Sequence, residues 1–466
     1  MSTLRRGDIQ GLRALAVILV VVYHTRLALP GGFIGVDVFF VISGYVITRA
    51  LVAELEQTGR LDYGSFYLRR IRRILPALAG LLLGVLALNL WLGPIGGHLV
   101  TSRTGTAAAL FNANTYLAGL VGGLGAGYFD PSAELNALLH TWSLSVEEQF
   151  YMGFPLLVGA SWWAARRWAG SDGRRAAMVS LGIVGTASFA LSIYLTAANA
   201  RLAFYLAPSR AWEFVAGALL VFTAAPASRL TGRSATTLAV IGLLAISAAS
   251  VIYDDGTAFP GSAALLPVVG TALVIIAGEA PTSNPIRRAL ELRPAQWLGD
   301  LSYSWYLWHW PLIVFAAATM PGSGTAKGLA AAVSLLPAFL SYRLIENPIR
   351  FRAAPSRTAT LRIAQLCILL PLVAGLVFDF GRDAVAESPE AGGYFDDFAY
   401  HLDHESGCDS NARFAERPDH CRFTVEDPRG TAVLVGDSNA GQLSEGFLAG
   451  VTSGGFDAVI ATQSGC

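Results

Sequence analysis

The sequence predicts a polytopic α-helical membrane protein of about eleven transmembrane helices, followed by the start of an α/β domain. The hydrophobic fraction is 53% and only 14% of the residues are charged, far from the averages of soluble proteins. Several runs of about twenty apolar residues have the length that a helix needs to cross a bilayer. The formal net charge of zero, without a basic tract, predicts no nucleic-acid partner.

Arginine clusters set the expected orientation of these helices. The spans are expected at 9–29, 33–54, 74–93, 138–165, 176–197, 205–224, 236–253, 262–279, 300–319, 327–346 and 360–380. The segment 101–121 is apolar but contains two asparagines, which favours an amphipathic or re-entrant piece. Clusters such as 69–73 and 166–175 then fall on one side, which the positive-inside rule makes cytoplasmic. We therefore expect the N-terminus inside and the C-terminus outside.

The first apolar stretch, Asp8 to Leu29, contains two side chains that are costly at membrane depth, Arg13 and His24. On a helix they share one face and lie roughly 16 Å apart along the axis. The predicted orientation places Arg13 toward the cytoplasm and His24 in the outer half of the membrane. A histidine can take a proton or an acyl group near neutral pH. The alternative for Arg13 is an anchor that extends to the interface.

Two further stretches carry charges next to the membrane. Within FYLRRIRRILP (66–76), Arg69 and Arg72 are three apart on one helix face and suit a grip on an anionic cytoplasmic ligand. An ordinary positive-inside anchor is the alternative. Asp37 follows the turn after the first helix and is expected either to orient His24 or the helix ends, or to be a surface cap. Three glycines nearby are expected to allow close helix packing: Gly32, Gly35 and Gly44.

The most polar predicted span begins with HTWSLSVEEQFY (140–151). Glu147 and Glu148 are adjacent, so they cannot fully share one helix face, and at least one is expected to face a polar cavity. His140 fits an interfacial cap. In SYSWYLWHWPL (302–312), His309 is either functional or an interfacial anchor within an aromatic belt.

After Phe380 the sequence becomes polar and acidic, and TAVLVGDSNAGQL (431–443) then begins a new unit. We expect a strand at 431–435, a tight turn at 436–438, a helix from Asn439 and a second strand at 456–462. A fold of this type needs more strands, so the chain is expected to stop inside a domain. Cys408 and Cys421 are close enough to form a disulfide, which requires an oxidising compartment; two free thiols in a cytosolic domain are the alternative. An outside C-terminus favours the disulfide.

The ordered set of motifs resembles the type-3 membrane acyltransferases over about residues 5–352. The motifs are the Arg13 and His24 pair, FIGVDVFFVISGYVIT, FYLRRIRRILPA, HTWSLSVEEQFY, SYSWYLWHWP and IENPIR. The eleventh helix and GDSN (436–439) resemble the branch fused to an extracytoplasmic SGNH-type domain. The expected domains are a ten-helix membrane acyltransferase domain (1–355), the eleventh helix (356–382), an extracytoplasmic linker (383–430) and the N-terminal part of an SGNH-like domain (431–466).

The resemblance implies transfer of an acyl group, usually acetyl, from cytoplasmic acetyl-CoA to a hydroxyl of an envelope carbohydrate or glycolipid. The protein would lie in a bacterial cytoplasmic membrane, with acyl-CoA as co-substrate and without a tightly bound cofactor or metal. In the SGNH resemblance Ser438 is the nucleophile, and Asp437 shapes the turn. The remaining residues that it singles out are Arg13, His24, Glu147 and Glu148 for catalysis, Asp37 and His309 in support, and Arg69, Arg72 and Arg73 near the coenzyme phosphates.

Two other functions use similar features. A transporter or flippase for a lipid-linked sugar also needs polar groups in its spans and cytoplasmic arginines, but it does not predict the GDS turn. A membrane-tethered esterase would use Ser438 alone, with the helices as an anchor. Charged groups inside so many spans exceed what an anchor needs.

Overall fold

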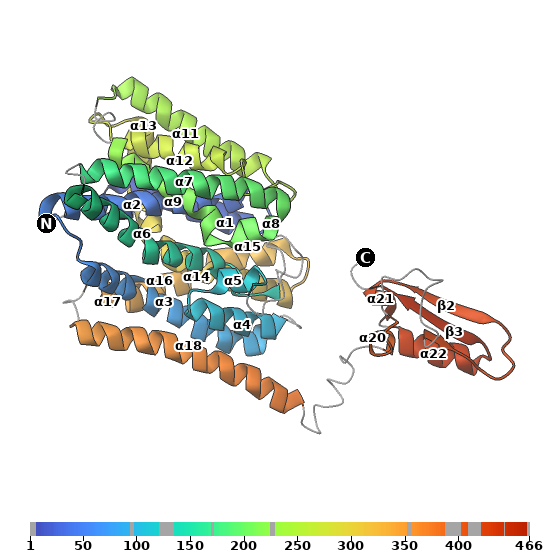
Figure 1. Ribbon diagram of the computed structural model, residues 1–466. Helices are drawn as coiled ribbons and strands as arrows, with labels where there is room; N and C mark the ends of the chain where they lie inside the picture. Colours follow the sequence, from blue (N-terminus) through green and yellow to red (C-terminus); the bar gives the residue numbers. More distant parts are fainter. Residues whose placement is uncertain are drawn as a thin grey trace. The chain divides into compact units, whose positions relative to one another are not determined.

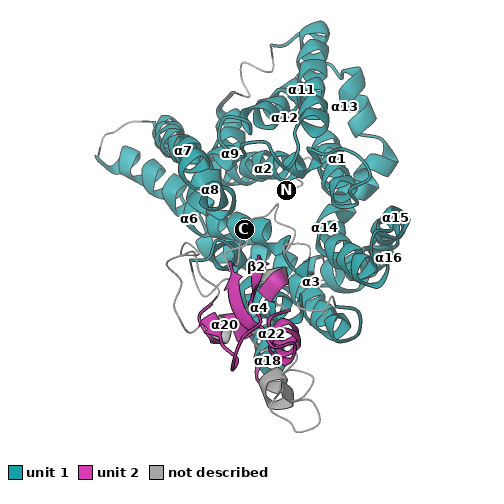
Figure 2. Cartoon of the chain, turned by 90° about the vertical axis from the view of Figure 1, so that its right-hand side faces the viewer, with its two compact units in different colours: residues 1–379 teal, residues 380–466 magenta. Residues whose placement is uncertain are grey.

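In the computed structural model the chain divides into two units, residues 1–379 and residues 380–466 (Figure 2). The structure describes residues 6–93, 97–120, 135–168, 172–223, 229–351, 356–386, 402–408, 421–441 and 443–463. The regular elements in the described residues of unit 1 are all helices, and unit 2 contains a small mixed sheet with short helices (Figure 1).

Within the described residues, seven helical segments are long and apolar enough to cross a membrane, which makes the chain a multi-pass membrane protein. Each overlaps a predicted span. The basic cluster 69–73 lies on the third of these helices, which begins before the predicted start at residue 74. Six of the segments are single helices: α1 (Gly7–His24), α2 (Gly35–Thr58), α3 (Tyr63–Leu92), α7 (Gly173–Ala198), α11 (Gly232–Ile252) and α18 (Arg357–Ala386). The seventh consists of four consecutive elements: α15 (Gly324–Val333), α16 (Leu335–Ser341), the π-helical turn η4 (Tyr342–Glu346) and α17 (Asn347–Phe351).

The other four predicted spans are also helical: α6 (Thr141–Trp168), α9 (Ala207–Leu220), α12 (Leu265–Gly278) and α14 (Arg293–Thr319). Two of these, α6 and α14, are long but rich in polar residues. The other two have 14 residues each, or about 21 Å of helix against a hydrocarbon core of about 30 Å. Length and composition therefore support seven spans, and the count of eleven stays a prediction.

The connecting segments are short helices. The segment 101–121 contains α4 (Gly97–Ala109) and α5 (Ala113–Leu117), and neither is long enough to span a bilayer. The remaining short elements are η1 (Gly32–Ile34), α8 (Ala200–Tyr205), η3 (Val221–Thr223) and α13 (Pro285–Leu290).

The first helix ends earlier than the apolar pattern predicts. It stops at His24 rather than Leu29. Arg26 and Leu29 have positive φ angles of 59° and 55°, a backbone conformation that non-glycine residues rarely adopt in a helix. His24 therefore lies in the last turn of α1, directly before an irregular loop.

The helices α1 and α2 form the centre of unit 1. The first packs against α14 and α2, and the second also packs against α9 and α12. In each, 67% of the apolar window is buried, compared with 11% in α18. Figure 2, in which many of these helices are seen end-on, shows α1 and α2 next to each other. The polar residues of α1 consequently face protein rather than lipid.

The contact between α2 and α9 depends on glycine. A Cβ atom at Gly44 would overlap the backbone carbonyl of Phe214, and one at Gly217 would overlap the backbone of α2. Gly32 and Gly35 approach the backbone of α1 in the same way. The prediction that the glycines at 32, 35 and 44 allow close helix packing is confirmed.

Unit 2 contains a three-stranded sheet in the order β1-β3-β2. The strands β2 (Thr431–Gly436) and β3 (Asp457–Thr462) are parallel, and α21 (Ser438–Gly441) and α22 (Ser444–Ser453) connect them. The predicted β-α-β start is confirmed. The antiparallel β1 (Arg422–Phe423) and the short α20 (Leu402–Glu405) lie in the stretch predicted as a linker, so structure begins before residue 431.

Candidate functional site

A cavity of about 940 Å³ lies among α1, α2, α3, α6 and α14. Its volume falls within the ~300–1,000 Å³ of sites that hold small organic ligands. The lining side chains have an excess of positive charge, which suits a polyanionic ligand. They comprise six arginines (Arg6, Arg13, Arg49, Arg70, Arg73 and Arg350) and three acids (Glu54, Glu147 and Asp300).

Of the arginines on α3, Arg70 and Arg73 line the cavity. Arg69 is exposed, and Arg72 donates from Nε to the Leu68 carbonyl oxygen at 3.1 Å; neither belongs to the cavity wall. Arg70 and Arg73 are also three residues apart, but each lies one position later than its counterpart in the pair that the sequence analysis named, Arg69 and Arg72. Arg70 is therefore a site residue that the sequence reasoning missed.

The two adjacent glutamates of α6 have different partners. Glu148 is buried, and its Oε1 lies 3.1 Å from Nη2 of Arg70, whose guanidinium also stacks over the Tyr151 ring at 3.5 Å. Glu147 lines the cavity and accepts hydrogen bonds from Ser43 Oγ at 2.7 Å and from the Tyr151 hydroxyl. The prediction that at least one faces a polar cavity is confirmed for Glu147, while Glu148 holds Arg70.

Among the described residues, three of the cavity arginines form no ion pair with an acid: Arg13, Arg49 and Arg73. The ion pairs in the described part of the chain include Arg70 and Arg350 but neither Arg13 nor Arg73. Arg350 is held by Glu346 at 3.2 Å, at the end of the π-helical turn η4. Such turns are rare and often occur at functional sites. Positive charges gathered on one partly desolvated wall are unfavourable unless an anion joins them.

At the C-terminal end of α1, Nδ1 of His24 lies 2.9 Å from Nε2 of His309 on α14. The two rings stack with centroids 5.1 Å apart, and Trp310 packs on His24 at 4.5 Å. His24 is 6% exposed and His309 is fully buried. The alternative that His309 is an interfacial anchor is therefore wrong, because its ring lies inside the helix bundle.

A third histidine, His140, also belongs to this cluster, with its ring centroid 5.6 Å from that of His309. It is 1% exposed, so its interpretation as an interfacial cap is wrong. Its Nε2–H donates to the Leu307 carbonyl oxygen at 2.9 Å. That carbonyl needs a partner because Pro311, four residues later, has no N–H to give it.

Tyr306 connects the cavity to the histidines. Its ring lines the cavity and lies 5.4 Å from His309 and 5.5 Å from His140, between centroids. Its hydroxyl donates to the His140 carbonyl oxygen at 3.0 Å and is 2.6 Å from Ser143 Oγ. The histidines themselves do not line the cavity, and Tyr306 is a cavity residue whose ring also contacts two of them.

Asp37 is fully buried in the first turn of α2, so the surface-cap alternative is wrong. Its Oδ1 lies 3.1 Å from Nη2 of Arg210, and Nη1 of Arg210 lies 3.1 Å from Glu213 on α9. Arg210 also faces several aromatic rings, including Phe40 at 5.6 Å. The group ties α2 to α9, which positions the cavity wall. Charged residues within a predicted span were the signal that could have revealed it.

In unit 2, Ser438 is the first residue of α21, and only Asp437 separates it from β2. Its side chain lies outside the described residues, so its role as nucleophile stays a prediction. The backbone carbonyl of Asp437 accepts a hydrogen bond from the Gly441 N–H at 3.1 Å, which closes one helical turn. The backbone thus has the strand, turn and helix order that the sequence predicts at GDSN.

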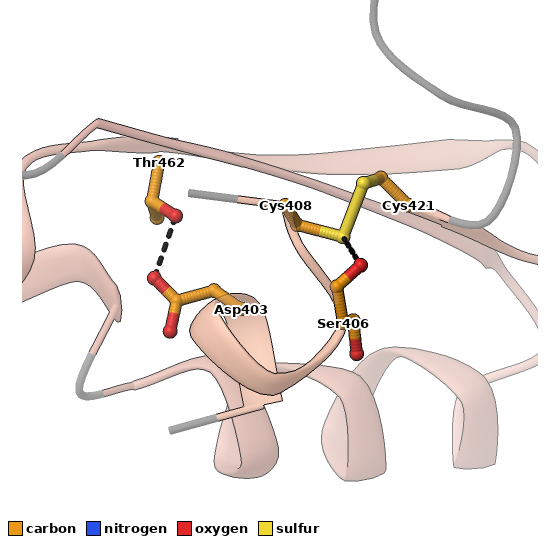
Figure 3. Close-up of a disulfide and its surroundings, with 5 residues drawn as sticks. All are labelled: Asp403, Ser406, Cys408, Cys421 and Thr462. Carbon is orange, nitrogen blue, oxygen red and sulfur yellow. Dashed lines mark hydrogen bonds between the residues drawn. A yellow bond between two sulfur atoms is a disulfide. The ribbon is translucent and has the colours of Figure 1, made fainter. Parts of the chain in front are cut away.

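The predicted disulfide is present: Cys408 and Cys421 are joined, with Cα atoms 5.4 Å apart (Figure 3). Asp403 on α20 accepts a hydrogen bond from Thr462 Oγ1 at 2.6 Å, which ties this segment to the end of β3 (Figure 3). Cys367 is a free thiol on α18.

A protein-family model described as "Acyltransferase domain" matches residues 6–342. The chain is 31% identical over 409 residues to "O-acetyltransferase OatA" of Staphylococcus aureus (strain MRSA252), covering 82% of this chain and 64% of the relative. It is 32% identical over 372 residues to "Putative peptidoglycan O-acetyltransferase YrhL" of Bacillus subtilis (77% and 57%). It is 30% identical over 357 residues to "Peptidoglycan O-acetyltransferase OatA" of Listeria monocytogenes (74% and 55%). No solved structure matches it significantly.

The chain spans 55–64% of the length of these three curated relatives. The matched range, residues 6–342, contains the cavity helices α1, α2, α3, α6 and α14 together with the histidine cluster. The comparison and the geometry thus concern the same part of the molecule. The chain belongs to the acyltransferase family that this model describes.

Proposed function

We propose that this chain is a membrane O-acetyltransferase that binds cytoplasmic acetyl-CoA in the cavity and passes the acetyl group to a carbohydrate hydroxyl on the opposite face. The observation that carries this proposal is the arrangement along α1. An arginine of the basic cavity, Arg13, lies in the second turn of the helix, and the buried His24 is its last residue. A binding site for a polyanion and a candidate base are thus held roughly 16 Å apart on one rigid element.

The cavity chemistry suits a coenzyme A thioester, which carries three phosphate groups and a thin, flexible arm. Arginine binds phosphate with two parallel hydrogen bonds, and Arg13 and Arg73 have no described acid to compete with a phosphate. Arg70 is oriented by Glu148. The geometry favours Arg70 and Arg73 over the sequence-derived pair Arg69 and Arg72 as phosphate ligands.

The expected orientation supports an acceptor outside the cell membrane. The positive-inside rule places the end of α1 that carries His24 outside, and the disulfide in unit 2 requires an oxidising compartment. The acetyl group would then pass to the acceptor directly or through Ser438. Peptidoglycan is the first acceptor to test because two relatives are named for it.

The test is release of free coenzyme A from acetyl-CoA, together with acetylation of added soluble peptidoglycan fragments, by the purified full chain. We expect turnover by the unmodified protein and loss of turnover in His24→Ala. His98→Ala, the same substitution on α4 and away from the histidine cluster, is the matched control and should turn over normally. Undiminished release by His24→Ala would contradict the assignment.

The same assay separates the two rival functions. A transporter or flippase would release no coenzyme A. A tethered esterase would lose all turnover in Ser438→Ala and none in His24→Ala. Ser438→Ala also separates the two routes to the acceptor: if this variant still acetylates peptidoglycan fully, the acetyl group passes without Ser438.

A further inference from the structure

We infer that His309 is a neutral hydrogen-bond acceptor that fixes the tautomer of His24, so that Nε2 of His24 is the basic atom of acyl transfer. The inference rests on the proposed function. It follows from the order of hydrogen-bond donors and acceptors that runs from the backbone of α14 through both imidazole rings.

The series of hydrogen bonds begins at the backbone of α14. Nδ1 of His309 lies 2.6 Å from the carbonyl oxygen of Tyr306 and 3.3 Å from that of Trp305. A carbonyl oxygen can only accept, so Nδ1 must carry the hydrogen. A neutral imidazole has one N–H, and Nε2 of His309 therefore has a lone pair directed at His24.

A doubly protonated His309 would reverse this order, but its surroundings do not favour a cation. The ring is fully buried, and its described polar contacts are His24 and the two carbonyl groups, without a carboxylate. A buried charge is costly unless an opposite charge accompanies it. The neutral form is therefore the one that this environment supports.

The second ring follows from the first. Nδ1 of His24 lies 2.9 Å from the lone pair of His309 Nε2, so it must be the donor. In a neutral His24 imidazole, which has one N–H, the lone pair is then on Nε2. Because the tautomer is set by the helix backbone of α14, it does not depend on which ligand is bound.

With Nε2 of His24 unprotonated, each bond and proton of the transfer step can be accounted for. The acceptor oxygen attacks the thioester carbonyl carbon, the new C–O bond forms and the C–S bond breaks. The hydroxyl proton moves to Nε2 of His24 and from there to the departing thiolate. During the step the His24 imidazolium keeps its Nδ1–H bond to His309, which stabilises the transient positive charge. The products are an acetyl ester and coenzyme A, and His24 is neutral again.

The test uses two amide substitutions that mimic different nitrogens of the same ring. In His309→Gln the side-chain oxygen can reach the position of Nε2 and accept from His24. In His309→Asn the amide reaches only the position of Nδ1, and the bond to His24 is lost. We expect His309→Gln to retain kcat for coenzyme A release within about 10-fold, and His309→Asn to lose at least about 100-fold, the low end for losing a general base. KM for acetyl-CoA should be unchanged in both variants.

The outcomes separate this inference from the proposed function. If His24→Ala is inactive but the Gln and Asn variants behave alike, the tautomer assignment is overturned and the proposed function stands. If His24→Ala is fully active, both fail. Should neither amide variant fold, solid-state NMR of the unmodified protein with ¹⁵N-labelled histidine decides, with the His24 signals assigned by their loss in His24→Ala. We expect His24 to carry a proton on Nδ1 and none on Nε2, and the opposite pattern overturns the inference.

Discussion

Glu147 and Glu148 are adjacent on α6, so their side chains point about 100° apart around the helix axis and have different roles. Glu147 faces the ligand space, whereas Glu148 compensates the buried charge of Arg70. The catalytic contribution of this acidic pair is therefore expected at Glu147, and its structural contribution at Glu148.

Substituting the two glutamates singly should separate these contributions. Glu148→Gln leaves Arg70 with Glu147 at 4.0 Å as its remaining acid, and breaking a buried pair costs up to about 3–5 kcal/mol. We expect a lower melting temperature in detergent and weaker acetyl-CoA binding. Glu147→Gln should melt like the unmodified protein but release coenzyme A more slowly. Indistinguishable effects of the two variants on melting and turnover would contradict this division.

The Asp37, Arg210 and Glu213 group is a second buried cluster, with two acids around one cation. Asp37→Asn leaves one acid and one base, a balanced pair. Arg210→Met leaves two buried acids without a cation. We expect Arg210→Met to lose several kcal/mol of stability, on the order of 3–5, and Asp37→Asn to lose clearly less. Thermal unfolding of the purified variants measures this order, and the reverse order would show that Arg210 is not the central charge.

Among the helices, the crossing of α2 and α9 is the contact least tolerant of change. We expect Gly44→Ala to destabilise the protein by at least about 1–3 kcal/mol, because the added methyl group meets backbone rather than a movable side chain. Gly153→Ala, on α6, is the matched control, since nothing lies within 4 Å of its added Cβ. Detergent-resistant folded yield on size-exclusion chromatography compares the two variants. Equal yields would mean that the crossing is looser than described.

The sequence was sufficient for the helices because apolar runs and arginine clusters are local signals. The sequence was not sufficient to predict which face of α3 meets the cavity. Arg70 lies four residues from both Phe66 and Ile74, which are buried, so the buried side of the helix could have indicated it. The choice of Arg69 and Arg72 used spacing alone, and spacing does not define which face meets the cavity.

The histidine cluster could not be assembled from the sequence. His24, His140 and His309 lie on or next to three helices that are distant in the sequence. No local sequence pattern predicts that these histidines meet. The surface-cap alternative for Asp37 failed for the same reason, because its partner on α9 is remote. By contrast, the disulfide was predictable because its cysteines are only 13 residues apart.

For the whole molecule, the disulfide provides a test of orientation. If unit 2 is outside, a thiol reagent that does not cross membranes should label Cys408 and Cys421 in intact cells only after an impermeant reductant is added. Cys408→Ser with Cys421→Ser is the control that should remove this labelling. Labelling that requires cell lysis would place unit 2 on the cytoplasmic side.

The central claim is that an acetyl group crosses the membrane domain while its carrier stays behind. Sealed vesicles with the cytoplasmic face outward can be given acetyl-CoA labelled separately in the acetyl group and in the adenine, with soluble peptidoglycan fragments inside. The account predicts that the acetyl label appears inside, that the adenine label stays outside, and that His24→Ala stops the transfer. Crossing of both labels, or crossing of the acetyl label that is undiminished in His24→Ala, would contradict it.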